Sequence, residues 1–149
     1  MSKRIIVDAD ACPKPVREII TTLTKTYAWE MVTVASFNHQ ISGEQHHVIV
    51  GNEPQAADLA VLQLTGKGDL VVTQDWGLAA LVMSKGAQAI SPRGIIYEEK
   101  KMDFLLEERY LKAKFRRQGG KTKGPAAWCK EDTERFQNKL EKLLNTSFC

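Results

Sequence analysis

The chain has 149 residues, of which 43% are hydrophobic and 26% charged, and its formal net charge is +3. These ordinary values fit one globular domain and exclude a mainly disordered, collagen-like or coiled-coil chain. No apolar run approaches the roughly 18 residues that span a bilayer, and the run after Arg4 is too short for a signal peptide, so we expect a cytoplasmic protein without a membrane segment.

The first 90 residues alternate predicted strands with predicted helices. A β-branched apolar run at residues 4–7 predicts a buried strand that ends in Asp8, and apolar residues from Val16 to Leu23 recur at helical spacing. The same patterns predict strands at 31–35, 47–50, 69–73 and 87–90 and helices at 54–64 and 78–85. Continuous apolar strands separated by helices indicate an α/β fold with a mostly parallel sheet that is covered on both faces.

After Pro92 the pattern changes to charged helices and a glycine-rich loop. We expect a helix over 102–115, a basic loop over 118–125 and a last helix over 131–144. The prediction is one domain over residues 1–149, with an α/β core at 1–91 and a helical, basic extension at 92–149.

Charge is divided unevenly along the chain. Residues 1–99 hold 8 Lys or Arg and 11 Asp or Glu, whereas residues 100–149 hold 13 and 7. Between Lys112 and Lys123 there are six basic residues and no acid. This segment favours a polyanionic partner, most often nucleic acid, although a solvated basic surface is the simpler interpretation of the run alone.

Four aspartates stand where a parallel sheet binds ligands. Asp8 and Asp10 follow the first predicted strand, Asp75 follows the fourth, and Asp58 lies near the start of the second helix. Gathered carboxylates repel one another unless a cation neutralises them, and oxygen ligands favour Mg²⁺ or Mn²⁺. We therefore expect Asp8, Asp58 and Asp75 to lie together, with a raised pKa in at least one of them.

Each acid alone has a simpler interpretation. Asp10 and Asp75 could be helix N-caps, and Asp58 could face solvent. The pair Asp8-x-Asp10 also resembles the start of haloacid-dehalogenase-type phosphatases, in which the first Asp is the nucleophile. The later acid of that family has only Asp103 as a candidate.

Other motifs point to no separate chemistry. A P-loop ending in Gly120-Lys121-Thr122 fails because Phe115 stands at its first glycine. The three histidines, which lie between residues 39 and 47, lack the spacing of zinc ligands. Cys12 is expected to be structural, because nearby carboxylates disfavour a thiolate.

Four motifs together, Val7–Pro13, Ala57-Asp58, Val71–Asp75 and Gly119–Pro125, resemble the uncharacterised bacterial YaiI/YqxD family. The resemblance spans nearly the whole chain and implies a branch of the PIN-like nucleases, with a three-layer α/β fold and a metal-binding carboxylate cluster. By that likeness Asp8, Asp58 and Asp75 would hold the metal, and Asp10 is an extra acid beside the first. The further acid that PIN sites often carry is absent from Trp76–Ala79.

The expected function is that of a metal-dependent nuclease acting on RNA. Asp8, Asp10, Asp58 and Asp75 would form the catalytic site with Mg²⁺ or Mn²⁺. The residues expected to bind the nucleic-acid backbone are Arg116, Arg117, Lys121, Thr122 and Lys123. Two alternatives stay open: a phosphatase with Asp8 as nucleophile, and a module that binds nucleic acid without cutting it. The sequence makes no prediction of oligomeric state.

Overall fold

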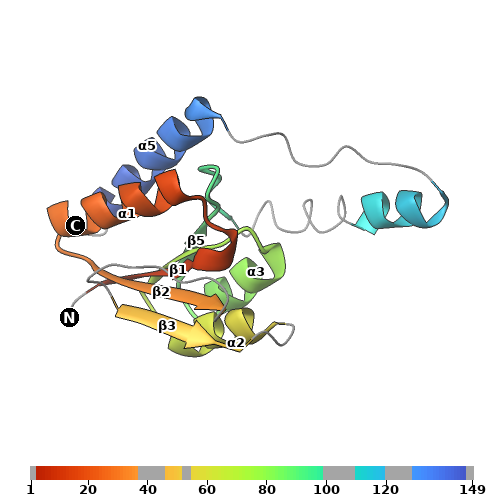
Figure 1. Cartoon of the computed structure of the whole chain (residues 1–149), viewed down its shortest axis with the longest axis horizontal. Helices are drawn as coiled ribbons and strands as arrows, with labels where there is room; N and C mark the ends of the chain where they lie inside the picture. Colours follow the sequence, from red (N-terminus) through yellow and green to blue (C-terminus); the bar gives the residue numbers. More distant parts are fainter. Residues whose placement is uncertain (1–2, 37–45, 52–54, 99–109, 120–128, 147–149) are drawn as a thin grey trace.

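The described part of the chain folds around a five-stranded sheet. The computed structural model describes residues 3–36, 46–51, 55–98, 110–119 and 129–146. The strands are β1 (Arg4–Asp8), β2 (Glu30–Ser36), β3 (His46–Val50), β4 (Leu70–Val72) and β5 (Gln88–Ile90). They lie in the order β3-β2-β1-β4-β5 with every strand pairing parallel, which confirms the predicted parallel sheet (Figure 1).

Helices cover both faces of this sheet. α1 (Lys14–Thr26) and α5 (Lys130–Thr146) lie side by side on one face (Figure 1). α2 (Ala56–Leu64) and α3 (Trp76–Ser84) pack on the other face. The predicted three-layer α/β fold is confirmed.

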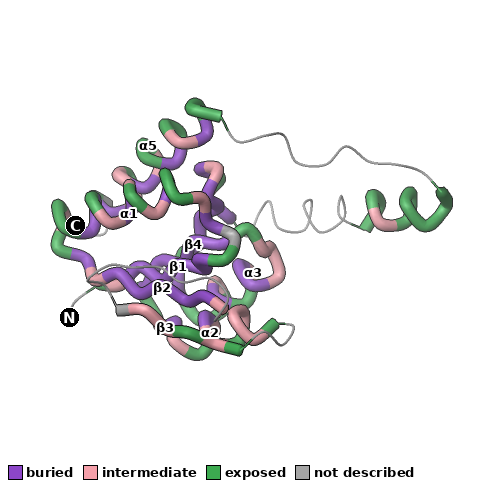
Figure 2. The backbone as a smooth tube through the Cα atoms, in the orientation of Figure 1, coloured by how far each residue is buried: buried purple, intermediate pink, exposed green. Residues whose placement is uncertain are grey.

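Each face has its own apolar core, because successive side chains of a strand point to opposite sides. On β1, Ile5 and Val7 belong to the core beneath α1 and α5, and Ile6 belongs to the core beneath α2 and α3. Figure 2 shows the central strands buried along their length, as expected for a parallel sheet between two helical layers.

The last helix completes the first of these cores. Phe136, Leu140 and Leu144 of α5 recur every four residues and are fully buried against α1 and the sheet. The sequence places this helix in a C-terminal extension, yet it contributes to the same core as the first strand. The chain before it approaches closely at Gly94, where an added Cβ would lie 2.7 Å from the backbone nitrogen of Phe136.

Predicted element boundaries agree with the structure to within a few residues, with an informative shift at α3. The sequence predicts this helix from Leu78, but it begins at Trp76, because the Asp75 carboxylate accepts a hydrogen bond from the Leu78 backbone N–H and caps the helix. Gly86 follows its end with a φ of +89°, the left-handed conformation expected of a glycine there.

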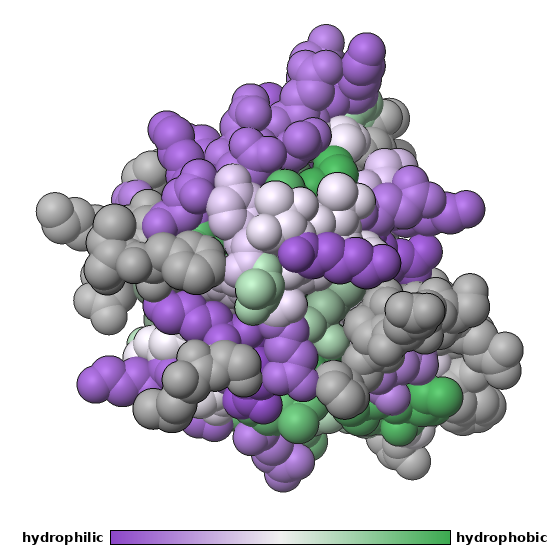
Figure 3. Space-filling view, turned by 90° about the vertical axis from the view of Figure 1, so that its left-hand side faces the viewer, coloured by the Kyte–Doolittle hydropathy of each residue, from purple (hydrophilic) through white to green (hydrophobic). Residues whose placement is uncertain are grey.

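The second half of the chain is described in part. Residues 110–117 form a helix that stands apart from the layers in Figure 1. The rest of the helix expected at 102–115, and the basic loop with Lys121, Thr122 and Lys123, lie outside the described residues. No helix within the described ranges is long and apolar enough to cross a membrane. Figure 3 shows the side of the molecule on which the carboxyl ends of α1 and α5 lie, and hydrophilic side chains cover the upper part of this side.

Candidate functional site

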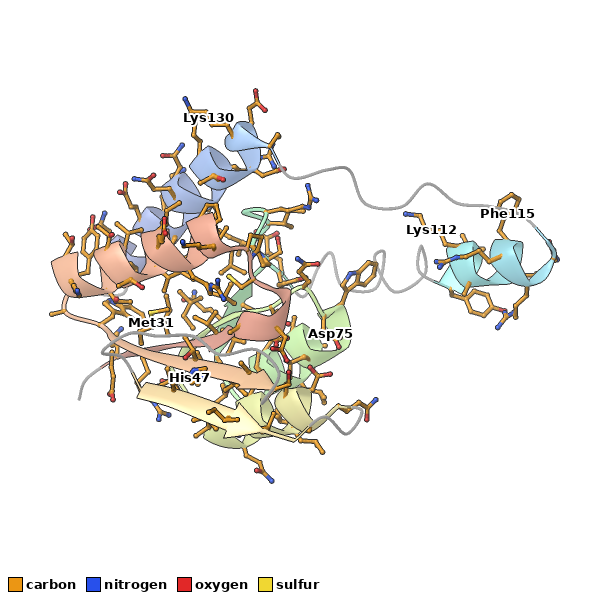
Figure 4. All side chains as sticks on the ribbon, viewed as in Figure 1. Met31, His47, Asp75, Lys112, Phe115 and Lys130 are labelled. Atoms are coloured by element: carbon orange, nitrogen blue, oxygen red, sulfur yellow. The ribbon has the colours of Figure 1, made fainter. Side chains whose placement is uncertain are left out.

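The acidic residues meet at the carboxyl ends of two neighbouring strands. Asp8 closes β1, and Thr73 and Asp75 follow β4, which pairs with β1 so that Val7 lies beside Val72. From β1 the chain continues to β2 and β3 on one side of the sheet, whereas β4 and β5 lie on the other. The gap between β1 and β4 is therefore the topological switch point, where open parallel sheets bind their ligands. Figure 4 shows Asp75 at this end of the sheet.

Asp8 is a buried carboxyl whose ionisation is opposed. Asp8 is only 7% exposed, and its Oδ2 accepts a hydrogen bond from the Thr73 hydroxyl at 3.3 Å. Burial first, and then the negative charge of Asp58, raises the pKa of Asp8 to about 6; Asp10 and Asp75 add smaller effects, and the Thr73 hydrogen bond acts in the opposite direction. The expected raised pKa is thus found in the acid that ends the first strand.

Asp58 and Asp75 form an acidic pair whose side chains interact. Asp58 lies in the first turn of α2, and burial, the charge of Asp75 and a side-chain hydrogen bond to Asp75 raise its pKa. Ionisation of Asp58 is thus opposed both by its burial and by the neighbouring negative charge. Asp75 caps α3, as one interpretation of the sequence predicts, and the same side chain also interacts with Asp58. Asp75 can therefore cap the helix and belong to the site at once.

Thr73 and Tyr97 support this cluster and were missed as site residues. The Thr73 hydroxyl donates to Asp8 and accepts from the Asp75 backbone N–H at 3.0 Å, so it joins the two acids. The Tyr97 hydroxyl donates to the Thr73 carbonyl at 3.1 Å. Burial, and then the charge of Asp75, raises the pKa of Tyr97 to about 12. Thr73 stands between a strand and an acid and could have been suspected, whereas Tyr97 has no local signal.

Asp10 has a different position from the other three acids. It is exposed in the short 3-10 helix η1 (Ala9–Ala11), and its carboxylate accepts from the Ser36 backbone N–H at 3.0 Å. This bond ties the turn after β1 to the end of β2, while α1 starts after Pro13, so capping of α1 by Asp10 is wrong. Its charge still contributes to the raised pKa of Asp8.

Cys12 agrees with the structural role expected of it. The residue is 5% exposed, and burial raises the pKa of its thiol to about 12, with the charge of Asp8 adding to the effect and Arg17 opposing it. At neutral pH the thiol therefore stays protonated.

The donor chemistry of the site fits a hard divalent ion that keeps much of its water. Within the part of the chain that the structure describes, no three His, Cys, Asp or Glu side chains are arranged so that together they could hold a metal ion. Mg²⁺ is commonly bound through one or two carboxylates and several waters, which the pair of Asp58 and Asp75 could provide, with Asp8 as the next carboxylate inward.

The basic residues lie on a separate element. Arg116 and Arg117 are exposed on the helix at 110–117, and Figure 4 shows Lys112 and Phe115 on the same helix, away from Asp75. Of the three histidines, the imidazole of His47 is described: its Nδ1 lies 2.6 Å from the Thr33 hydroxyl, in a contact between neighbouring strands.

Comparison with known proteins finds one family. Residues 6–146 match the uncharacterised YaiI/YqxD family. A UPF0178 protein of Heliobacterium modesticaldum is 45% identical over 141 residues, which cover 95% of this chain and 96% of that one. A UPF0178 protein of Staphylococcus saprophyticus is 39% identical over 149 residues, covering 97% and 96%. No solved structure shows a significant match.

Proposed function

This chain belongs to the uncharacterised YaiI/YqxD family, and from that premise we propose that it is a metal-dependent nuclease that acts on RNA in the cytoplasm. The names of its relatives carry no activity, so the proposal depends on the site. The observation that supports it is the proximity of Asp58 of α2 to Asp8 and Asp75, which stand at the carboxyl ends of β1 and β4, with raised pKa values for Asp8 and Asp58. Strongly perturbed acids at a switch point are typical of functional sites.

The acids are unfavourable for the fold when all of them are ionised without a counter-ion. Asp8 is buried, and each of the other acids raises its pKa. Neutral or apolar residues in these positions would remove the repulsion, so a role in binding positive charge explains why three acids gather here. Asp58 and Asp75 would hold Mg²⁺ or Mn²⁺, and Asp8 would add negative charge behind them.

The chain's own residues have distinct parts in this proposal. Thr73 fixes Oδ2 of Asp8 and the backbone of Asp75, so it sets the relative orientation of the two acids. Asp75 is held in place by its capping bond to the start of α3. A divalent ion bound here would orient a phosphodiester, activate a water and stabilise the leaving oxygen.

The helix at 110–117 supports RNA as the partner. Residues 110–119 include Lys112, Lys114, Arg116 and Arg117 and no acid, and all four basic side chains are exposed. Tyr110 and Phe115 on the same helix are 59% and 50% exposed, so aromatic rings accompany the positive charge. Basic side chains bind phosphates and exposed rings stack on bases, a combination typical of proteins that bind single strands.

The test is cleavage of an end-labelled RNA in Mg²⁺, in Mn²⁺ and in EDTA. We expect cleavage only with a divalent ion, and we expect Asp58→Asn to abolish it while leaving much of the RNA affinity. Glu18→Gln removes one exposed charge on α1 and serves as the control, with cleavage unchanged.

The same preparation separates the competing functions. Equal cleavage by wild type and Asp58→Asn would contradict the proposed site. Undiminished RNA binding in EDTA, with no cleavage in any divalent ion, would assign the protein to binding without catalysis. An aspartyl-phosphate trapped on Asp8 would assign it to the phosphatases.

A further inference from the structure

A pocket adjoins Asp58 and Asp75 on the face of the sheet that α2 and α3 cover. It has a volume of about 310 Å³ and lies between α2 and α3, lined by Gln55, Asp58, Leu59, Leu62, Asp75, Gly77, Leu78 and Leu81. This volume is at the small end of the roughly 300–1,000 Å³ usual for ligand pockets. Asp58 and Asp75 belong to its wall, so whatever enters it is held directly beside the two carboxyl groups.

We infer that this pocket receives a nucleobase of a single-stranded nucleic acid whose phosphate lies at Asp58 and Asp75, an inference that rests on the proposed function. The wall away from the acids consists mainly of leucine side chains, which suit the flat, weakly polar face of a base. Among the described side chains that line the pocket none is basic, so a phosphate has no positive charge to pair with inside it. The phosphate therefore stays at the acid end, where a bound cation would neutralise its charge.

The pocket has exposed apolar side chains that a bound base would cover. Leu59 of α2 and Leu81 of α3 are 57% and 52% exposed, although both line the same pocket. Covering them would remove apolar surface from water, which favours binding. Gln55 lies at the start of α2 with a φ of +66°, an unfavourable conformation for any residue other than glycine, and it carries an amide that can both donate to and accept from a base.

The position of the pocket defines the substrate class. A base paired within a duplex cannot enter a space between two helices unless it first leaves its stack. A single strand, or a nucleotide already unpaired in a loop, meets no such obstacle, and sequence-tolerant binding of unpaired bases is common in RNA recognition. We therefore expect cutting beside unpaired nucleotides and little cutting within duplex RNA.

The experiment follows the leucine methyl groups of the full chain by NMR in the presence of Mg²⁺. Uridine and adenosine 5′-monophosphate should shift the methyl signals of Leu59, Leu62 and Leu81. Ribose 5-phosphate, which has the same sugar and phosphate without a base, should leave them unchanged. Leu140, buried in the other core, reports on any general change in the protein.

A variant pair measures the contribution of the pocket. Leu59→Ala with Leu81→Ala should weaken nucleotide binding by about three- to tenfold, because about two apolar contacts with the base are lost. Both side chains are more than half exposed, so the fold should tolerate the change. Ile95→Ala, at a residue 53% exposed elsewhere, is the matched control and should bind as the wild type does.

Three other results would overturn the inference, and a fourth would overturn the proposed nuclease alone. Equal methyl shifts with ribose 5-phosphate, or none with any nucleotide, would show that the pocket does not bind the base. Shifts caused by lysine or arginine methyl ester but not by nucleotides would assign the pocket to a basic side chain of a protein partner. Metal-dependent cleavage that is undiminished by an abasic nucleotide at every position of the substrate would refute the base pocket and leave the proposed nuclease standing. Base-specific methyl shifts in a protein that cuts no RNA would refute the nuclease and leave the base pocket standing.

Discussion

Replacing Asp8 by Asn should make the protein more stable at neutral pH. The pKa of Asp8 is raised from 3.8 to about 6, and one pKa unit corresponds to about 1.4 kcal/mol. Ionised Asp8 therefore lowers the free energy of unfolding by about 3 kcal/mol. Asn carries no charge, and its side-chain oxygen can still accept the hydrogen bond that the Thr73 hydroxyl donates to Asp8.

The pH dependence of this gain is specific. Because the folded-state pKa is the higher one, the stability contributed by protonated Asp8 is fully present below about pH 3.8 and is lost as the pH rises through about 6. The difference between Asp8→Asn and wild type should thus be near zero at pH 3.5, grow between pH 4 and 6, and level off at about 3 kcal/mol above pH 7.

Urea unfolding at a series of pH values, followed by circular dichroism, measures this difference directly. Glu18→Gln, an exposed acid on α1, controls for the loss of one negative charge and should show no such gain. Mg²⁺ should narrow the difference, since a cation held by Asp58 and Asp75 is attracted by the charge of ionised Asp8 in the wild type, a charge that the variant lacks. An Asp8→Asn variant less stable than wild type at pH 7.5, or a difference independent of pH, would refute the reasoning.

Three further predictions concern other parts of the chain. Gly94→Ala should lower the free energy of unfolding by about 2–5 kcal/mol, because its φ of +86° and its contact with α5 both oppose a Cβ. Gly68→Ala, at a φ of +87° with no described atom within 4 Å, should lower it by only about 1–2 kcal/mol. Equal losses for the two variants in urea unfolding would show that the contact with α5 does not matter. With its pKa raised to about 12, the Cys12 thiol should react with a maleimide far more slowly in the folded protein than in urea, and Cys12→Ser should keep any metal-dependent cleavage; its loss in a folded variant would make the thiol functional. Replacing Arg116 and Arg117 by Ala should lower the salt slope of single-stranded RNA binding by about 1.4, near 0.7 for each phosphate contact, and an unchanged slope would show that this helix faces only solvent.

The architecture could be predicted from the sequence because its signals are local. The run from Arg4 to Val7 is apolar at every position but the first, as a strand covered on both faces requires, and Val16, Ile20 and Leu23 mark the inner side of α1. The position of α5 could not be predicted in this way. Its apolar side is visible in the sequence, but the partner of that side is set by packing across more than a hundred residues.

The sequence identifies the acidic residues of the site one by one, but it does not reveal which of them contact one another. Strand-end placement identifies Asp8 and Asp75, while the strand order decides that they are neighbours. The apolar surroundings of Asp58 in the sequence indicate an unusual environment, yet its contact with Asp75 depends on how α2 and α3 pack. Tyr97 lies beyond the last strand and reaches Thr73 only because the chain folds back beside β5.

The packing of α5 against α1 has a consequence for synthesis on the ribosome. β5 ends at Ile90 and α5 begins at Lys130, so the ribosome adds the 39 residues between them before the helix that completes the cover of this face begins. At roughly 5–20 residues per second this takes roughly 2–8 s. During that time the apolar residues of α1 and the sheet that later pack against Phe136, Leu140 and Leu144 lack that contact. The nascent chain therefore passes through a stage in which this face of its sheet has α1 but not α5, and the apolar residues left uncovered are open to chaperones and to other chains.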